Sequence, residues 1–141
     1  MREKYRAVMA VWLVLVREGK ILLQLRQNTG YMDGKWDMAA SGHLEADEKL
    51  EEGIIREAAE EIGVRVKKKS LKLITVEYDD GDGYMRFFFA CDAFEGKPRV
   101  MEPEKCVQLK WFSMKALPVN LIPAVGRAIE RIQNGVFYDI K

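Results

Sequence analysis

The sequence has few of the residues on which disulfide-rich domains and zinc proteins depend. It contains 2 cysteines, 1 histidine and 4 prolines among 141 residues. Cys91 and Cys106 form no Cys-x-x-Cys pair and show no metal-ligand spacing. The sequence therefore excludes a disulfide framework and a cysteine-based metal centre, and both cysteines are expected to be buried, reduced thiols.

Long apolar segments are also missing. The longest, from Ala7 to Val16, has roughly ten residues, about half of what a membrane-spanning helix needs. Arg17 and Glu18 follow it where a signal peptide would place small residues. The net charge is +1, so no global field attracts nucleic acid or a membrane surface. We expect a cytoplasmic protein that binds neither nucleic acid nor membrane, and a homodimer is left open.

The composition that remains is typical of a folded domain. Hydrophobic residues make up 48% of the chain and charged residues 32%. The sequence has no internal repeat, low-complexity tract or interdomain linker. At this length one hydrophobic core is sufficient, so residues 1–141 are expected to form a single domain.

The most informative stretch of the sequence is residues 42–64. Residues 48–62 lack proline and are rich in helix formers, and Gly63 stands where a helix should end, so we predict a helix over 48–62. Helical periodicity divides its residues between two faces. The acidic face carries Glu57, Glu60 and Glu61, and the apolar face carries Ile54, Ile55, Ala58, Ala59 and Ile62.

Three carboxylates within one helical turn repel each other, and they lie near the helix C-terminus, where negative charge is disfavoured. A hard cation such as Mg²⁺ or Mn²⁺ would neutralise them, with phosphate oxygens as further ligands. Gly53, one turn before Glu57, is costly inside a helix, so a close approach by substrate or neighbouring backbone is expected there. An isolated acidic cluster of this kind is otherwise an ordinary solvated helix face.

The spacing of these residues favours the functional interpretation. Gly42 is followed after five residues by Glu48, then after seven by Arg56-Glu57, after two by Glu60-Glu61 and after one by Gly63-Val64. This pattern resembles the signature of the Nudix hydrolases. The aliphatic residue expected after Arg-Glu is Ala58 here, a small change on the apolar face.

The resemblance implies a metal site and a set of catalytic roles. Glu57, Glu60 and Glu61 would bind Mg²⁺, with Mn²⁺ as a substitute, and a backbone carbonyl of Ser41 or Gly42 would complete the site. Other roles fall on further residues: Glu48 would support the ligands, Arg56 would orient carboxylates or contact phosphate, and Glu57 or Glu104 would take a proton from water.

Five residues are candidates for substrate binding, each with an ordinary alternative. Arg26 matches a strand-end arginine near phosphates in the family, or is a solvated charge. Tyr31 and Trp36 could stack on a base or ribose, although tryptophan at a strand start is at least as often core. His43 would contact substrate or lie on the surface. Asn120 would read a base edge, as in MutT-type relatives, or cap a helix.

The expected fold is α/β. Residues 5–16 and 21–25 indicate a hairpin, and the last helix is expected at 121–134 with an apolar stripe. Further strands are expected at 36–40, 71–78, 84–94 and 107–112. With the resemblance, this order implies the Nudix α/β/α sandwich, a mixed β-sheet between helices.

The implied reaction is hydrolysis of a phosphoanhydride bond in a nucleoside diphosphate linked to another group. A nucleoside triphosphate, oxidised or normal, is favoured, which would yield a monophosphate and pyrophosphate. The alternatives are an ADP-ribose or dinucleotide pyrophosphatase, an isopentenyl-diphosphate isomerase-like enzyme, and a non-catalytic nucleotide-binding module.

Overall fold

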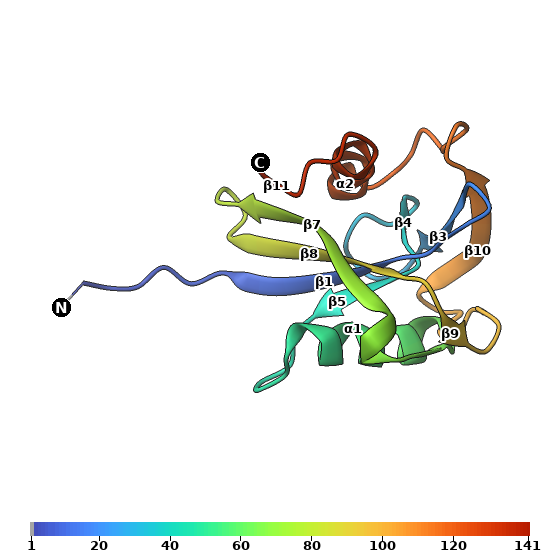
Figure 1. Ribbon diagram of the computed structural model, residues 1–141, viewed down its shortest axis with the longest axis horizontal. Helices are drawn as coiled ribbons and strands as arrows, with labels where there is room; N and C mark the ends of the chain where they lie inside the picture. Colours follow the sequence, from blue (N-terminus) through green and yellow to red (C-terminus); the bar gives the residue numbers. More distant parts are fainter. Residues whose placement is uncertain (1) are drawn as a thin grey trace.

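The computed structural model describes residues 2–141 and places a mixed β-sheet between two helices (Figure 1). The five strands of this sheet lie in the order β11-β7-β8-β1-β5. β1 runs parallel to β8, and β11 runs parallel to β7, whereas the other two pairs are antiparallel. The predicted α/β/α arrangement is confirmed. The strand bounds are β1 Val8–Val14, β5 Ala40–His43, β7 Leu71–Asp79, β8 Tyr84–Cys91 and β11 Tyr138–Ile140.

A second sheet is formed by four further strands. Its strands follow the order β10-β3-β2, and β4 pairs with β3. A further two-stranded sheet joins β6 to β9, and a 3₁₀ turn occupies Lys68–Ser70. The bounds are β2 Val16–Arg17, β3 Lys20–Arg26, β4 Trp36–Met38, β6 Arg65–Val66, β9 Phe94–Glu95 and β10 Cys106–Ser113.

The predicted N-terminal hairpin is only partly right. β2 and β3 pair as a hairpin, but β1 belongs to the other sheet, so residues 5–16 do not form one strand. The chain changes sheets at Leu15, which is 1% exposed and whose carbonyl accepts a hydrogen bond from Leu22 N at 3.0 Å. A continuous apolar run does not reveal such a switch, because the apolar residues continue from β1 into β2 without a turn residue.

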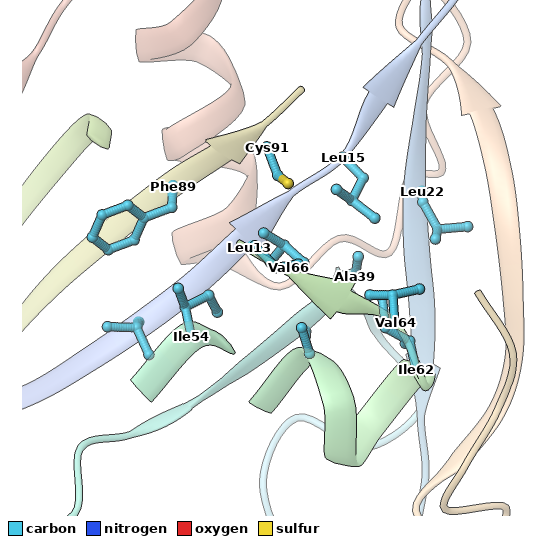
Figure 2. Packing of buried hydrophobic residues seen from close by; sticks show 13 residues of the cluster. Leu13, Leu15, Leu22, Ala39, Ile54, Ile62, Val64, Val66, Phe89 and Cys91 are labelled. Carbon is cyan, nitrogen blue, oxygen red and sulfur yellow. The ribbon is translucent and has the colours of Figure 1, made fainter. Parts of the chain in front are cut away.

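Helix α1 (Leu50–Ile62) covers one face of the main sheet, and α2 (Pro123–Gln133) covers the other (Figure 1). Successive side chains of a strand point to opposite faces, so β1 divides its residues between two cores. Val11 and Leu13 pack with Ile54 of α1 (Figure 2). Val14 packs with Val125 of α2. Among residues 2–141, neither helix is long and apolar enough to cross a membrane.

Helix α1 begins at Leu50, two residues later than predicted, and ends at Gly63 as predicted. Gly63 has φ 69°, and its N–H donates to the carbonyls of Ala58 and Ala59. Glycine adopts this left-handed backbone conformation at little cost, which explains why the helix ends here. Ala59, expected on the apolar face, is exposed, because it lies at the edge of the buried stripe.

Gly53 is confined by the side chains of Leu44 and Glu48, and not by neighbouring backbone. A Cβ at Gly53 would overlap Leu44 Cδ2 and lie 3.2 Å from Glu48 Oε1. The missing side chain therefore allows the segment before α1 to pack closely against the helix.

Ile54→Ala should lower the free energy of unfolding by about 2–5 kcal/mol, because Ile54 is fully buried in the α1 core. Ala59→Gln, on the same helix but exposed, should change it by less than about 0.5 kcal/mol. Urea unfolding of both variants measures the difference. Equal losses would contradict the assignment of the helix faces.

Candidate active site

The acidic residues of α1 open onto a cleft of about 410 Å³, here called the acidic cleft. The cleft lies between α1, β3, β5 and two loops, residues 27–35 and 96–105. Its lining includes Gln24, Arg26, Ser41, Glu57, Glu60, Glu61, Glu102 and Lys105. Side chains from distant parts of the sequence thus meet at the predicted acidic face.

Arg56 holds the carboxylates at the base of this cleft. Its Nε and NH2 donate to both oxygens of Glu48 at 2.8 and 3.0 Å, and its NH1 donates to Glu57 Oε1 at 2.5 Å. NH2 also donates to the His43 carbonyl at 3.1 Å. The hydrogen bonds from Arg56 lower the pKa of Glu48. Glu48 is therefore bound to Arg56, and Glu57 keeps its second oxygen for the cleft.

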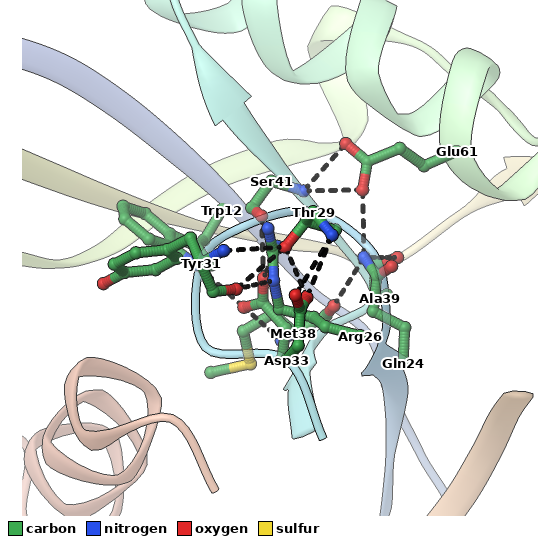
Figure 3. A network of polar contacts seen from close by, with 11 residues as sticks. Trp12, Gln24, Arg26, Thr29, Tyr31, Asp33, Met38, Ala39, Ser41 and Glu61 are labelled. Carbon is green, nitrogen blue, oxygen red and sulfur yellow. Dashed lines mark hydrogen bonds and ion pairs between the residues drawn. The ribbon is translucent and has the colours of Figure 1, made fainter. Parts of the chain in front are cut away.

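Glu61 is the most deeply buried acid of the cleft. Gln24 Nε2 donates to its Oε1 at 2.9 Å, and Ser41 N approaches both of its oxygens at 3.3–3.4 Å (Figure 3). Burial raises the pKa of Glu61, and the neighbouring Glu57 carboxyl raises it further. Two adjacent carboxyl groups in a partly dry cleft require either a proton or a cation between them.

The register of β5 decides which carbonyl faces these acids. Ser41 N points to Glu61, and the His43 carbonyl points to Arg56. Leu44 N points the other way and donates to the carbonyl of Met9 in β1. In an antiparallel strand the N–H and C=O of one residue point to the same side, and the sides alternate. The Ser41 carbonyl therefore faces α1, and the Gly42 carbonyl faces β1.

Gly42 is needed for another reason. A Cβ at this position would lie 2.5 Å from Glu57 Oε1 and 2.8 Å from Oε2. Only a residue without a side chain lets β5 lie directly against the Glu57 carboxylate.

The donors suit a hard divalent cation in type. Glu57, Glu61 and the Ser41 carbonyl supply oxygens alone, which Mg²⁺ and Mn²⁺ prefer. No three acidic, histidine or cysteine side chains of residues 2–141 converge as a metal-ligand group. Glu60 accounts for this, because its side chain is 53% exposed and lies 3.4 Å from Arg56 NH1. Glu60 nevertheless lines the same cleft as Glu57 and Glu61.

The loop at residues 96–105 contributes a different acid from the one predicted. Glu102 lines the acidic cleft, whereas Glu104 is exposed and is absent from its lining. The N–H groups of Arg99 and Met101 donate to Ile62 O and Glu61 O at the end of α1, which carries the loop to the cleft. Its Lys105 also lines the cleft, 3.9 Å from Glu102.

A second hollow of about 310 Å³, here called the aromatic cleft, adjoins the first. Both clefts are lined by Arg26 and Ser41. Trp12 stacks on Phe88 with ring centroids 4.9 Å apart, and His43 packs edge-on against Tyr84. The lining is completed by Ala10, Tyr31, Asp37, Gly42, Arg86 and Ile122.

Asp37 joins the two clefts. It is 2% exposed and accepts hydrogen bonds from Trp12 Nε1 at 3.0 Å, Arg26 NH1 at 3.0 Å and Ser41 Oγ at 2.9 Å. Its own neighbour Met38 N also donates to it at 2.8 Å. The Asp37 carboxylate is therefore saturated, and it fixes Arg26 between the acidic and the aromatic cleft.

Tyr31 is presented by an internally bonded loop (Figure 3). Asp33 accepts bonds from Thr29 N, Thr29 Oγ1 and Gly30 N, and these bonds lower the pKa of Asp33. Arg26 Nε donates to Tyr31 O at 2.9 Å. The exposed ring of Tyr31 is thus held at the rim of the aromatic cleft.

Two predicted substrate residues lie elsewhere. Trp36 is 8% exposed and packs edge-on against Phe112 in the core, so its ring is closed to a base. Asn120 does not cap α2, because the N-cap position is Ile122. The Asn120 amide donates to Gly34 O at 2.9 Å, and the residue lines neither cleft.

Sequence reasoning missed several residues of both clefts. Gln24, Asp37 and Arg86 are polar residues inside apolar strands, and each is buried. A polar residue in an apolar strand was an available signal, because such residues are buried only with specific partners. No local pattern, however, indicates that Trp12 and Glu102 reach the site.

Comparison with known proteins agrees with this geometry. A family model described as the NUDIX domain matches residues 4–132. A Caenorhabditis elegans protein named "Putative nudix hydrolase 1" is 31% identical over 99 residues, which are 70% of this chain and 26% of that protein. The NAD-capped RNA hydrolase NudC of Shigella flexneri is 27% identical over 132 residues, 93% of this chain and 49% of NudC.

A solved structure is similar over nearly its whole length. The MutT NUDIX hydrolase of Burkholderia pseudomallei has a TM-score of 0.80 and 29% identity, with 90% of this chain and 98% of that chain covered. The chain described here belongs to the Nudix family, as its sequence pattern predicted. It spans only about a quarter and a half of the two curated relatives above.

Gly42→Ala should weaken Mn²⁺ binding by roughly tenfold or more, because its Cβ displaces the Glu57 carboxylate. Titration followed by calorimetry measures the affinity. Gly126→Ala in α2 is the matched control, since nothing lies within 4 Å of its Cβ, and it should leave metal affinity unchanged. Equal affinities in all three proteins would show that β5 does not constrain Glu57.

Glu61→Gln should raise the melting temperature of the metal-free protein near pH 7. Because the folded pKa of Glu61 is raised, its contribution to stability is complete below the ordinary carboxyl pKa and is lost as pH rises through the folded value. The amide removes this loss, so the variant should melt at a higher temperature than the wild type. Glu60→Gln, at an exposed side chain, is the control and should not shift the midpoint.

Proposed function

We propose that this Nudix protein hydrolyses a phosphoanhydride bond in a nucleoside diphosphate linked to another group, with Mg²⁺ or Mn²⁺ as cofactor. One observation carries the proposal: the acidic cleft and the aromatic cleft share Arg26 and Ser41. A substrate with charged phosphates on one side and a flat nucleoside on the other fits two such adjoining sites.

Each side of the site has a distinct task. Glu57, Glu60, Glu61 and the Ser41 carbonyl would hold the cation, which when bound neutralises phosphate charge and lowers the pKa of a water. Arg56 keeps Glu57 in place, and Arg26 and Lys105 are the cations available to phosphate oxygens. These residues bring charge and orientation to the diphosphate.

Glu102 replaces Glu104 as the loop acid in this proposal. Glu102 lines the acidic cleft together with Glu57, so either can accept a proton from the attacking water. The long approach of Lys105 to Glu102, at 3.9 Å, leaves the Glu102 carboxylate free to act as a base.

A nucleoside triphosphate is the proposed substrate, cleaved to a monophosphate and pyrophosphate. The 29% identical structural relative is a MutT NUDIX hydrolase, and the aromatic cleft has the size for one nucleoside. The name of NudC, an NAD-capped RNA hydrolase, keeps a dinucleotide substrate as the second candidate. The net charge is only +1, which favours a free nucleotide over a nucleic acid as the substrate. We place this activity in the cytoplasm.

The two alternatives outside hydrolysis find less support. An isomerase with a reactive cysteine needs an accessible thiolate, whereas burial raises the pKa of both Cys91 and Cys106. A non-catalytic module has no use for the adjacent Glu57 and Glu61 carboxyl groups, because partial burial makes the charged form of Glu61 unfavourable without a cation.

Glu57→Gln and Glu61→Gln should each lower kcat by at least roughly 100-fold, about 2.7 kcal/mol of transition-state stabilisation. Glu102→Gln should lower kcat with little change in KM, and Glu104→Gln should behave as wild type. The assay is a panel of nucleoside triphosphates, oxidised guanine nucleotides, ADP-ribose, NADH and diadenosine polyphosphates, with products identified by mass. Undiminished turnover in EDTA would refute the proposal.

A further inference from the structure

Arg86 is a buried arginine at the aromatic cleft that neither the family pattern nor the proposed chemistry uses. It lies on β8, its side chain is 4% exposed, and it lines the cleft. The register places Ala10 of β1 beside Arg86, and His43 of β5 beside Ala10. Ala10 is small, and it lines the cleft together with Arg86, Trp12, Tyr84 and His43.

An ion network on the α2 side holds this guanidinium in one orientation. Arg86 NH1 donates to Glu77 Oε1 at 3.0 Å and to Asp79 Oδ2 at 2.7 Å. Glu77 also accepts Arg127 Nε and NH2 at 2.8 and 3.0 Å, and Arg131 NH1 at 2.9 Å. Asp79 is buried, and within residues 2–141 Arg86 is its only side-chain donor, so rotation of Arg86 would leave the Asp79 charge unpaired.

The opposite edge of Arg86 is held only weakly. Within residues 2–141, Nε and NH2 form no hydrogen bond, NH2 makes one long ion pair of 3.8 Å with exposed Asp82, and the guanidinium lies 4.9 Å from the centre of the Tyr84 ring. Among residues 2–141, Arg131 NH2 is the only buried side-chain nitrogen or oxygen that has neither a hydrogen-bond partner nor contact with solvent. Nε and NH2 of Arg86 therefore retain some solvent contact. With NH1 turned to the acids, the free Nε–NH2 edge is the one that the cleft reaches.

This edge presents two parallel donors and no acceptor. Asp37, the only carboxylate that lines the aromatic cleft in the described chain, is saturated by four donors. A ligand group at Arg86 must therefore offer two neighbouring acceptors. On the edge that each base presents to a major groove, guanine offers two neighbouring acceptors, O6 and N7, whereas adenine pairs its N7 with an amino donor and cytosine presents an amino donor.

We infer that Arg86 reads the O6–N7 edge of a guanine base seated in the aromatic cleft, and so selects guanine nucleotides among the substrates of this site. The inference rests on the proposed function, because it names the base of the same nucleotide. Trp12, held by its stacking on Phe88 and its bond to Asp37, is a rigid aromatic wall for the base. Oxidised guanine carries a hydrogen on N7, so the unmodified base fits the two donors better.

Binding of nucleoside monophosphates tests the inference without hydrolysis, because they contain no anhydride bond. Calorimetry in the presence of Mg²⁺ should give GMP and IMP, which share O6 and N7, affinities at least about tenfold higher than that of AMP. 7-Deaza-GMP, which lacks N7, should bind more weakly than GMP. AMP binding as tightly as GMP, no loss with 7-deaza-GMP, or no binding of any monophosphate would overturn it.

Two variants separate base reading from support of the fold. Arg86→Lys keeps the charge but loses the parallel donors, so the ratio of GMP to AMP affinity should fall to about one. Arg131→Lys disturbs the same ion network but does not line the aromatic cleft, and it should keep the wild-type ratio. An unchanged ratio in Arg86→Lys, or an equal fall in both variants, would assign Arg86 a structural role only.

The two proposals can fail separately. Selective GMP binding without hydrolysis of any anhydride would retain the role of Arg86 and remove the proposed function. Equal kcat/KM for GTP and ATP with equal monophosphate affinities would retain the hydrolase and remove guanine selection.

Discussion

The site depends on one constraint, which is that several carboxylates are placed together on the last turns of α1. Arg56 offsets part of their charge by bonding to Glu48, Glu57 and the His43 carbonyl at once. This single side chain ties α1 to β5 and to the segment before the helix. Arg56 does not bond to Glu61. Burial and the neighbouring Glu57 carboxyl raise the pKa of Glu61, so its negative charge is still unfavourable unless a cation binds in the cleft.

The surrounding architecture follows from bringing a ligand to those acids. β5 can approach Glu57 because Gly42 has no side chain. The loop at 96–105 is anchored on the final carbonyls of α1, and so Glu102 is delivered to the opposite wall. Asp37 then orients Arg26 at the point where the phosphates of a nucleotide would pass into the aromatic cleft.

The buried charged side chains on the α2 side of the sheet have a different role. A group of buried guanidinium and carboxylate side chains gives little net stability, because desolvation offsets their attraction. Such a network does fix orientation, and here it turns one edge of Arg86 toward the acids and frees the other. The proposals therefore divide the two faces of the main sheet: metal and phosphate would bind near α1, and the base would bind on the face that α2 partly covers.

The helix, its end and its acidic face were determined by the sequence alone. Each depends on neighbours a few residues apart: glycine at Gly63 stops the helix, and the spacing of Glu57, Glu60 and Glu61 follows its period. The order of strands and helices was equally local, and together with the family resemblance it indicated the fold class. The family pattern also belongs to this range, because it lies within residues 42–64.

Only the tertiary structure decided which distant residues join that helix. The sheet switch at Leu15, the burial of Trp36 and the choice of Glu102 over Glu104 depend on packing between segments far apart in sequence. The same is true of Arg86, which reads in the sequence as a charge in an apolar strand. A periodic pattern specifies which face is buried, but pairing across sheets specifies which side chains meet, and that information is not local.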